Sequence, residues 1–302
     1  MDRLTLAVVS RNYFNMPAWI AREAGLFAAE GLDVQIDHIE GIEEVNDRVR
    51  DGSAQLAYGV TEHVVLDAET GGRQVIIGGN VNKLPFSFIA RPGIHDLAGL
   101  RGKRIGVSAI RAGSSSLVMR LLATAGLHYP RDYDLVACGP ILARWELLRS
   151  GGIDAGLQGA PLDHLALDQG FVSLCNPRET VPHFQFTSLD VTTDWATANS
   201  DLLLRFLRAF LRAHAWFYAN REGANAIAVQ ESGIAPHYAD RAWQDYVTAE
   251  IFPRDGRASI PGVQALIETS ALIRELPSRA GTRAESYIDH SWIEAAAASL
   301  HA

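Results

Sequence analysis

Short apolar runs alternate with segments of helical character along this chain, and that alternation constrains the fold more than any other feature. In the first unit, apolar runs predict strands at residues 4–9, 34–39, 56–58 and 75–79. The same pattern predicts strands in a second unit at residues 104–107, 134–137, 155–158 and 171–174. Strands that alternate with helices are typical of sheets flanked by helices. The sequence therefore predicts an α/β protein with two sheet units.

Two segments are expected to carry the chain between these units. Residues 86–90 lead out of the first unit, and the chain returns near residues 184–191. We expect one lobe to comprise residues 1–88 plus 190–302, including C-terminal helices that fill residues 223–300, and a second lobe to comprise residues 89–189. In the helical stripe that follows the return, His214 shares a face with apolar residues and is expected to be a core histidine.

Composition argues against several classes of partner. The 302 residues carry a formal net charge of −8 with no basic run, which argues against nucleic acid. No apolar run is long enough to span a bilayer, so no membrane insertion is expected. Cys138 and Cys175 are too few for a disulfide framework or a cysteine-rich metal site.

Metal and cofactor sites are not expected from residue spacing. The side chains that could ligate a metal, which show no recognisable ligand spacing, are Glu40, Glu62, His63 and His164. The chain begins with MDRLTLAVVS, which leads directly into a strand without a charged leader. As it stands, the sequence predicts a cytoplasmic protein, and a periplasmic one if a leader has been removed.

Residues 101–127, RGKRIGVSAIRAGSSSLVMRLLATAGL, predict an anion-binding helix end. The segment is interpreted as a turn, a buried strand, a polar loop and a helix that opens on Ser114, Ser115 and Ser116, whose hydroxyls would cap it. The first N–H groups of a helix have no partners inside it and attract carboxylate, sulfonate or phosphate groups. An ordinary capped helix is the alternative interpretation.

Four segments, in order along the chain, resemble those of one known group of proteins. They are PAWIAREAGLFAAEGLDVQI, VRDGSAQLAYG, DLAGLRGKRIGV and LLRSGGIDAGLQGAP. Together they resemble the type II periplasmic-binding-protein fold, in the group that contains sulfonate, nitrate and taurine binders and NMT1/THI5-like proteins. The resemblance implies two α/β lobes joined by two crossing strands, with a ligand held between the lobes.

Candidate ligand-binding residues follow from where open α/β sheets bind ligands, beyond the carboxyl ends of their strands. In the first lobe these positions are Arg11, Asn12, Tyr13, Glu40, Thr61, Asn80, Asn82 and Lys83. In the second lobe they are Ser108, Arg111, Ser114, Ser115, Gln158 and, further along, His164. The resemblance also implies an aromatic wall near the return crossing, where Trp195 stands. Arg11 and Arg111 are expected to hold an anion, because a guanidinium makes a two-pronged match to acid groups, although each could equally be a solvated loop arginine.

Two functions are compatible with these features. The favoured one is a solute receptor of the ABC-transporter type that closes over a small anionic or zwitterionic organic molecule, with an ABC permease as partner. The alternative, implied by relatives of the fold, is a cytoplasmic lyase, a decarboxylase or dehydratase of an aromatic or cyclic carboxylic acid or related heterocycle. In that case Glu62 and His63 would move the proton. Helical neighbours point about 100° apart, so only one of the pair is expected to reach the ligand. The cysteine cluster of thiamine-pyrimidine synthases is not present, so their chemistry is not expected.

Overall fold

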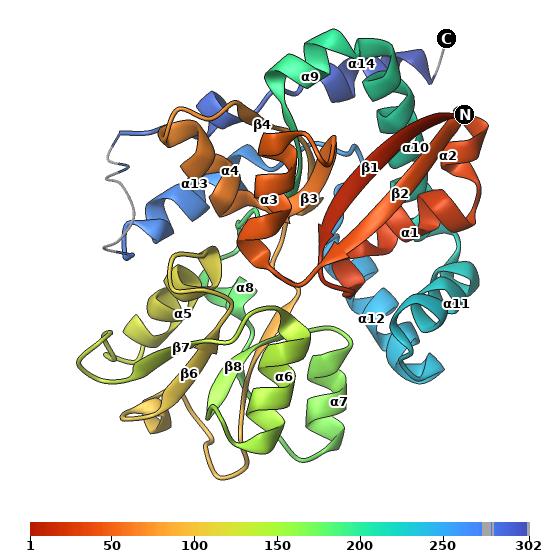
Figure 1. Ribbon diagram of the computed structural model, residues 1–302. Helices are drawn as coiled ribbons and strands as arrows, with labels where there is room; N and C mark the ends of the chain where they lie inside the picture. Colours follow the sequence, from red (N-terminus) through yellow and green to blue (C-terminus); the bar gives the residue numbers. More distant parts are fainter. Residues whose placement is uncertain (274–278, 280, 301–302) are drawn as a thin grey trace.

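Two mixed sheets of five strands form the two lobes of the computed structural model, which describes residues 1–273, 279 and 281–300 (Figure 1). The first sheet contains, in spatial order, β2 (Leu32–Ile39), β1 (Asp2–Val9), β3 (Leu56–Val60), β10 (Thr187–Thr192) and β4 (Gln74–Val81). The second contains, in spatial order, β7 (Asp134–Ala137), β6 (Arg104–Val107), β8 (Ala155–Gly159), β5 (Phe86–Ala90) and β9 (Val172–Cys175). The predicted two-lobed α/β architecture is confirmed.

One antiparallel strand in each sheet lies next to a crossing of the chain. β5 enters the second sheet with Phe86 opposite Gly159, the last residue of β8. β10 returns to the first sheet with Thr187 opposite Val60 and Val81, the last residues of β3 and β4. The carboxyl ends of the remaining strands therefore lie at the edges where the chain passes between the lobes.

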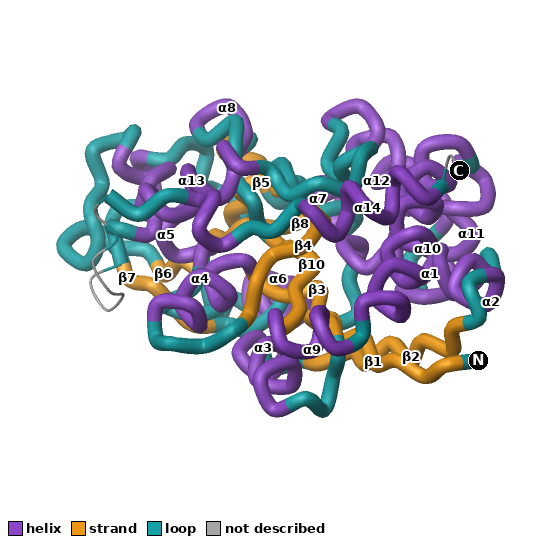
Figure 2. The backbone as a smooth tube through the Cα atoms, turned by 90° about the horizontal axis from the view of Figure 1, so that it is seen from above, coloured by secondary structure: helices purple, strands orange, loops and turns teal. Residues whose placement is uncertain are grey.

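Most of the helices belong to the first lobe, where α1 packs on α10 and α11 (Figure 2). Its helices are α1 (Met16–Glu23), α2 (Leu26–Ala29), α3 (Ile42–Asp51), α4 (Thr61–Glu69), α9 (Thr193–Ala198), α10 (Ser200–Ala219), α11 (Arg221–Ser232), α12 (Pro236–Ala249), α13 (Ile260–Ser270) and α14 (Ser291–Ser299). Short 3-10 turns occupy Tyr13–Asn15, Ala98–Leu100 and Ala284–Tyr287. Among the described residues, none of the helices has the length and apolar character needed to cross a membrane.

The second sheet is covered by helices on both faces. These helices are α5 (Gly113–Ala123), α6 (Ile141–Ser150), α7 (Leu162–Asp168) and α8 (Pro177–Thr180). Phe88 packs in the main apolar cluster with residues of α5, whereas its neighbour Ile89 packs with residues of α6 and α7. Alternate residues of a strand point to opposite faces, so α5 lies on one face and α6 and α7 on the other. Two helices of the first lobe reach across: α13 contacts α5, and α12 contacts α7.

Several local expectations are confirmed and others are wrong. The strands expected at 104–107 and 134–137 have those bounds. The sequence pattern predicts one helix that begins with Asn15 as its cap and runs to about Ala29. This helix is interrupted at Gly25, whose φ of +69° separates α1 from α2. Asn15 does not cap α1 with its side chain; its amide donates to the Ser10 carbonyl at 2.7 Å.

The helical region after residue 200 contains the expected core histidine. His214 is fully buried, and its Nδ1 lies 2.6 Å from the Pro253 carbonyl oxygen. Burial lowers the pKa of His214 to about 4, so the ring is neutral in the folded protein. The part of the expected C-terminal helices that falls on residues 274–278 and 280 lies outside the described residues.

The first sheet also contains a buried acid, Asp190 in β10. Its Oδ1 accepts a hydrogen bond from Ser188 Oγ at 2.6 Å, and its Oδ2 has no hydrogen-bond partner within the described part of the chain. Burial raises the pKa of Asp190 well above its ordinary value, which favours the neutral carboxyl in the folded protein. A Cβ at Gly59 would stand 2.9 Å from both Asp190 Oδ2 and Asn46 Oδ1, so a glycine there lets these two oxygens approach the backbone of β3.

We expect Asp190→Asn to flatten the pH dependence of stability. The carboxyl has a higher pKa in the folded than in the unfolded chain, so its contribution to stability is lost as the pH rises above the unfolded value of about 4. The loss approaches about 1.4 kcal/mol per pH unit until the folded carboxyl ionises. Urea unfolding at pH 5 and pH 8 should show an advantage of the variant that grows with pH. Asp33→Asn, at an exposed position in β2, is the control. Equal pH slopes for wild type and Asp190→Asn would contradict the expectation.

Candidate functional site

Several side chains predicted at the strand ends carry buried polar atoms without a hydrogen-bond partner among the described residues. These atoms are Tyr13 Oη, His63 Nδ1, Asn80 Oδ1 and both amide atoms of Gln158. They belong to residues that follow β1 or β3 or lie in β4 and β8. A buried polar group without a partner costs about 1–3 kcal/mol, so such a group usually faces a water or a ligand. Both lobes therefore supply groups able to bind a ligand.

Arg144, in the first turn of α6, is the functional candidate that the sequence analysis missed. Its side chain is buried, with 1% of the residue exposed, and its Nε donates to the Leu157 carbonyl at 2.8 Å. No carboxylate among the described residues forms an ion pair with its guanidinium. A Cβ at Gly106 would stand 3.2 Å from Arg144 Cγ, and one at Gly156 would stand 3.1 Å from Arg144 Cδ. The two glycines make room for this side chain against the sheet.

The charge of Arg144 is left uncompensated by the residues that the structure describes. Burial lowers the pKa of Arg144 to about 10, so the guanidinium is still protonated at neutral pH. A buried charge is costly unless an opposite charge or strong hydrogen bonds accompany it. A signal for this residue exists in the sequence, because Arg144 is the one charged residue on the buried face of α6, beside Ile141, Trp145 and Leu148.

The serines at the start of α5 hold the preceding loop and do not cap the helix. The helix begins at Gly113 without a side-chain cap. Ser114 Oγ accepts from the Ser108 N–H at 2.9 Å, and Ser115 Oγ donates to the Ala109 carbonyl at 2.7 Å. A Cβ at Gly113 would stand 3.4 Å from the Phe184 ring, so an apolar side chain covers the helix start. The predicted hydroxyl cap is wrong, because these hydroxyls hold the preceding loop instead.

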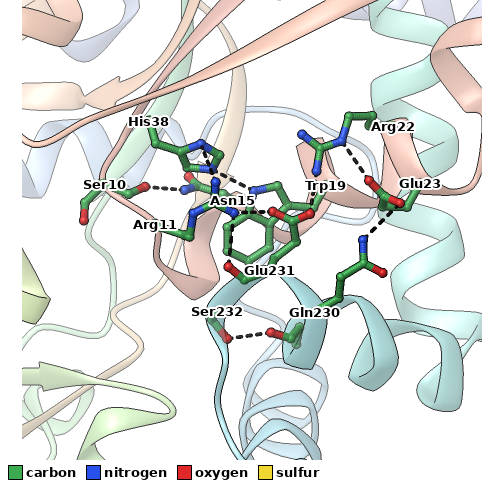
Figure 3. Close-up of polar contacts among 11 residues, drawn as sticks. Ser10, Arg11, Asn15, Trp19, Arg22, Glu23, His38, Gln230, Glu231 and Ser232 are labelled. Carbon is green, nitrogen blue, oxygen red and sulfur yellow. Dashed lines mark hydrogen bonds and ion pairs between the residues drawn. The ribbon is translucent and has the colours of Figure 1, made fainter.

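Arg11 is neutralised by an acid from a distant helix. Its Nη1 donates to Glu231 Oε2 at 2.6 Å, and Arg22 binds the other oxygen of the same carboxylate (Figure 3). His38 stands beside it, with Nδ1 3.5 Å from Arg11 Nη2. The expectation of an anion-binding Arg11 is therefore corrected, because its charge is already balanced by Glu231 of α11.

Arg111 and His63 are brought together, from different lobes, in a pocket of about 250 Å³ that Glu43 and Asp47 of α3 also line. His63 is 8% exposed, and burial lowers its pKa, so its ring is neutral at pH 7. Arg111 is exposed and has no ion-pair partner among the residues described. The pocket mixes these acids and Asp67 with two arginines, Arg50 and Arg111.

Glu62 faces away from His63. Its carboxylate forms an ion pair with the buried Arg279, which also binds Glu69 with Nε at 2.9 Å from both carboxylate oxygens. Burial raises the pKa of Glu62 to about 7 despite this pairing. The two neighbours therefore occupy different surroundings, as their helical spacing predicts, and they do not form an acid–base pair.

Other predicted residues serve the loops around the junction. Asn12 Oδ1 accepts from the Phe14 N–H at 3.0 Å, and Glu40 accepts from Ser10 Oγ at 3.1 Å. Asn82 donates to the Arg257 carbonyl at 2.8 Å. The side chains of Asn12, Glu40 and Asn82, which were predicted to contact a ligand, therefore make hydrogen bonds within the protein.

Thr61 and Lys83 follow β3 and β4 as expected, whereas Trp195 lies elsewhere than expected. Thr61 is the first residue of α4, and its Oγ1 donates to Ser188 Oγ at 3.0 Å. Lys83 lines a separate pocket of about 360 Å³. Trp195 is in α9, which follows the end of β10; there Thr192 pairs with Gln74, the first residue of β4 (Figure 1). Trp195 is therefore at the edge of the sheet opposite the junction and forms no wall there.

Comparison with known proteins identifies the fold. A family model described as NMT1/THI5 like matches residues 13–224. No curated protein matches the sequence. The alkanesulfonate-binding protein SsuA from Xanthomonas axonopodis pv. citri, bound to MOPS, is similar over 98% of both chains, with 17% identity and a TM-score of 0.75. The periplasmic nitrate-binding protein NrtA from Synechocystis PCC 6803 is similar over 99% of this chain and 89% of its own, with 14% identity and a TM-score of 0.81.

An enzyme shares the same architecture. The desulfurization enzyme DszB is similar over 99% of this chain and 100% of its own, with 15% identity and a TM-score of 0.71. At these identities the likeness shows the fold alone, and the expected periplasmic-binding-protein fold is confirmed. Because one fold serves both binding and catalysis, the choice between them depends on the side chains.

Replacing the two buried arginines by methionine should affect stability very differently in the absence of solute. Arg144→Met removes a charge without a carboxylate partner, so the free energy of unfolding should stay within about 1 kcal/mol of wild type or rise. Arg279→Met leaves Glu62 buried without its partner, so the free energy of unfolding should fall by about 3–5 kcal/mol. Urea unfolding measures both changes. A similar large loss in both variants would show that Arg144 is compensated in the folded protein.

Proposed function

The chain belongs to the NMT1/THI5-like family, and from this membership we propose that it is a receptor that closes its two lobes over a small organic anion. The observation that carries the proposal is the buried guanidinium of Arg144, which has no carboxylate partner among the described residues. It lies in the first turn of α6 and donates to a carbonyl of β8, at the edge where the chain enters the second lobe. A ligand anion at this position would supply the missing counter-charge.

The ligand chemistry follows from the groups that stand without partners. A guanidinium binds the paired oxygens of a carboxylate or sulfonate, which favours those acids over a neutral solute. Gln158 adds an amide that both donates and accepts, and Asn80 of the first lobe adds an acceptor oxygen. An acceptor suits a ligand hydroxyl or ammonium, so a zwitterion fits the site as well as a simple acid.

Closure of the two lobes suits a receptor, and the surroundings of Glu62 argue against the lyase alternative. Two lobes joined by two crossings can close around a ligand by a hinge motion. SsuA and NrtA are described as binders of alkanesulfonate and nitrate, which are both anions. The lyase alternative needs a proton carrier beside the ligand, and Glu62, engaged with Arg279, does not partner His63. Our proposal includes a periplasmic location, where the protein would deliver its solute to an ABC permease.

The test is to identify what the purified protein retains. It is incubated with a panel of sulfonates, aromatic and cyclic carboxylates, and pyrimidines, and bound compounds are released and weighed by mass spectrometry. We expect one acid to be retained and recovered unchanged. Recovery of a compound lighter by carbon dioxide or water would show a lyase and overturn the proposal.

Variants then locate the binding site. With the retained acid, Arg144→Met and Gln158→Leu should each weaken binding by about 10- to 100-fold in calorimetry, as expected for a lost hydrogen bond to a charged group. Arg149→Met is the matched control, because Arg149 lies on the same helix, pairs with Glu146 and is exposed. Wild-type affinity in Arg144→Met would place the site elsewhere.

A further inference from the structure

Another pocket lies where α7 of the second lobe meets α12 of the first, and nothing in the receptor proposal uses it (Figure 1). Its volume is about 220 Å³. Asp163 and His164 line it from α7, and Asp245 and Tyr246 line it from α12. The pocket therefore draws chemically active side chains from both lobes.

Three of these side chains have the composition and spacing of a metal site. One ligand atom from each of Asp163, His164 and Asp245 can be chosen so that all lie within 4.8 Å of one another. His164 Nε2 lies 2.7 Å from Asp245 Oδ2. Two carboxylate oxygens and an imidazole nitrogen form a ligand set that suits zinc and neighbouring divalent transition metals.

A buried hydroxyl in the same pocket independently indicates a ligand. Tyr246 is fully buried, and its Oη has no hydrogen-bond partner among the described residues. Tyr246 lines the same pocket as Asp163, His164 and Asp245. A water bound to a cation would give this hydroxyl the partner that the protein does not.

The surroundings already orient one carboxylate. Asp163 accepts from Ser87 Oγ at 3.0 Å through Oδ2 and from the His164 N–H at 2.8 Å through Oδ1. Hydrogen bonds of this kind hold the ligands of metal sites in place. The basic side chain that lines the pocket, Arg178, donates to the Leu84 carbonyl at 2.7 Å.

We propose that Asp163, His164 and Asp245 bind one divalent transition-metal cation that joins the two lobes. Zinc at about 2.1 Å from each ligand atom needs those atoms about 3.4 Å apart. The site is completed when His164 Nε2 and Asp245 Oδ2, now 2.7 Å apart, separate slightly and the more distant ligand atoms of the group move closer. Because two ligands belong to α7 and the third to α12, the bound cation holds the lobes together. The site is separate from Arg144 and does not depend on the identity of the solute.

The experiment titrates Zn²⁺ into EDTA-treated, solute-free protein by calorimetry. Wild type should bind one Zn²⁺ per chain with a raised melting temperature. His164→Ala and Asp245→Asn should each weaken binding by at least about tenfold. Asp168→Asn is the matched control, because it removes the neighbouring pair with Arg241 across the same helices but no proposed ligand atom. Melting curves without metal show whether each variant folds.

Small-angle scattering tests the joining of the lobes. Zn²⁺ should reduce the radius of gyration of wild type and of Asp168→Asn, and should leave that of Asp245→Asn unchanged. Failure of wild type to bind Zn²⁺, or equal binding by wild type and His164→Ala, would overturn the site. Full Zn²⁺ affinity in Asp245→Asn would overturn the role of α12 and with it the link between the lobes.

Discussion

The rest of the structure depends on one constraint: at each crossing between the lobes, the chain enters the next sheet as an antiparallel strand. β5 and β10 each enter a sheet beside the last residues of its parallel strands, as the pairs Phe86–Gly159 and Thr187–Val60 show. The carboxyl ends of strands in both lobes are thereby brought to the same junction. Loops that are more than a hundred residues apart in sequence then share one region, without any need for a long connecting loop.

The arginines of this protein differ in whether an acid balances their charge. The buried Arg279 is surrounded by acids, with Glu62 and Glu69 in contact, and the half-exposed Arg11 is likewise balanced by Glu231. Arg144 is as deeply buried as Arg279, but among the described residues its hydrogen-bond partner is a backbone carbonyl, which its Nε contacts. Charges that are balanced within the protein stabilise the fold and have no capacity left for a ligand. Arg144, whose charge is not balanced by a described acid, has that capacity. The presence or absence of a paired acid therefore distinguishes structural arginines from the functional candidate better than sequence position does.

Local pattern predicted the strands, the two lobes and the core position of His214, because burial and periodicity are properties of neighbouring residues. It failed where the outcome depends on a distant partner. Arg11 follows a strand end as expected, but its guanidinium forms an ion pair with Glu231 of the distant helix α11. Trp195 follows a strand that runs opposite to its neighbours, a direction that no local pattern reveals. The Asp163, His164 and Asp245 group has no recognisable spacing, since its members come from two helices that meet only in the folded chain.

The two glycines beneath Arg144 have a consequence for how this protein can diverge. A methyl group at Gly156 would stand 3.1 Å from Arg144 Cδ, and one at Gly106 would crowd Cγ of the same side chain. A mutation to alanine at Gly156 crowds the arginine, and a smaller residue at position 144 relieves that contact. At Gly106 the added methyl group would first meet Ile153 Cδ1, at 2.3 Å, so a change at position 144 alone does not make room there. Positions 144 and 156 should therefore covary among descendants of this protein.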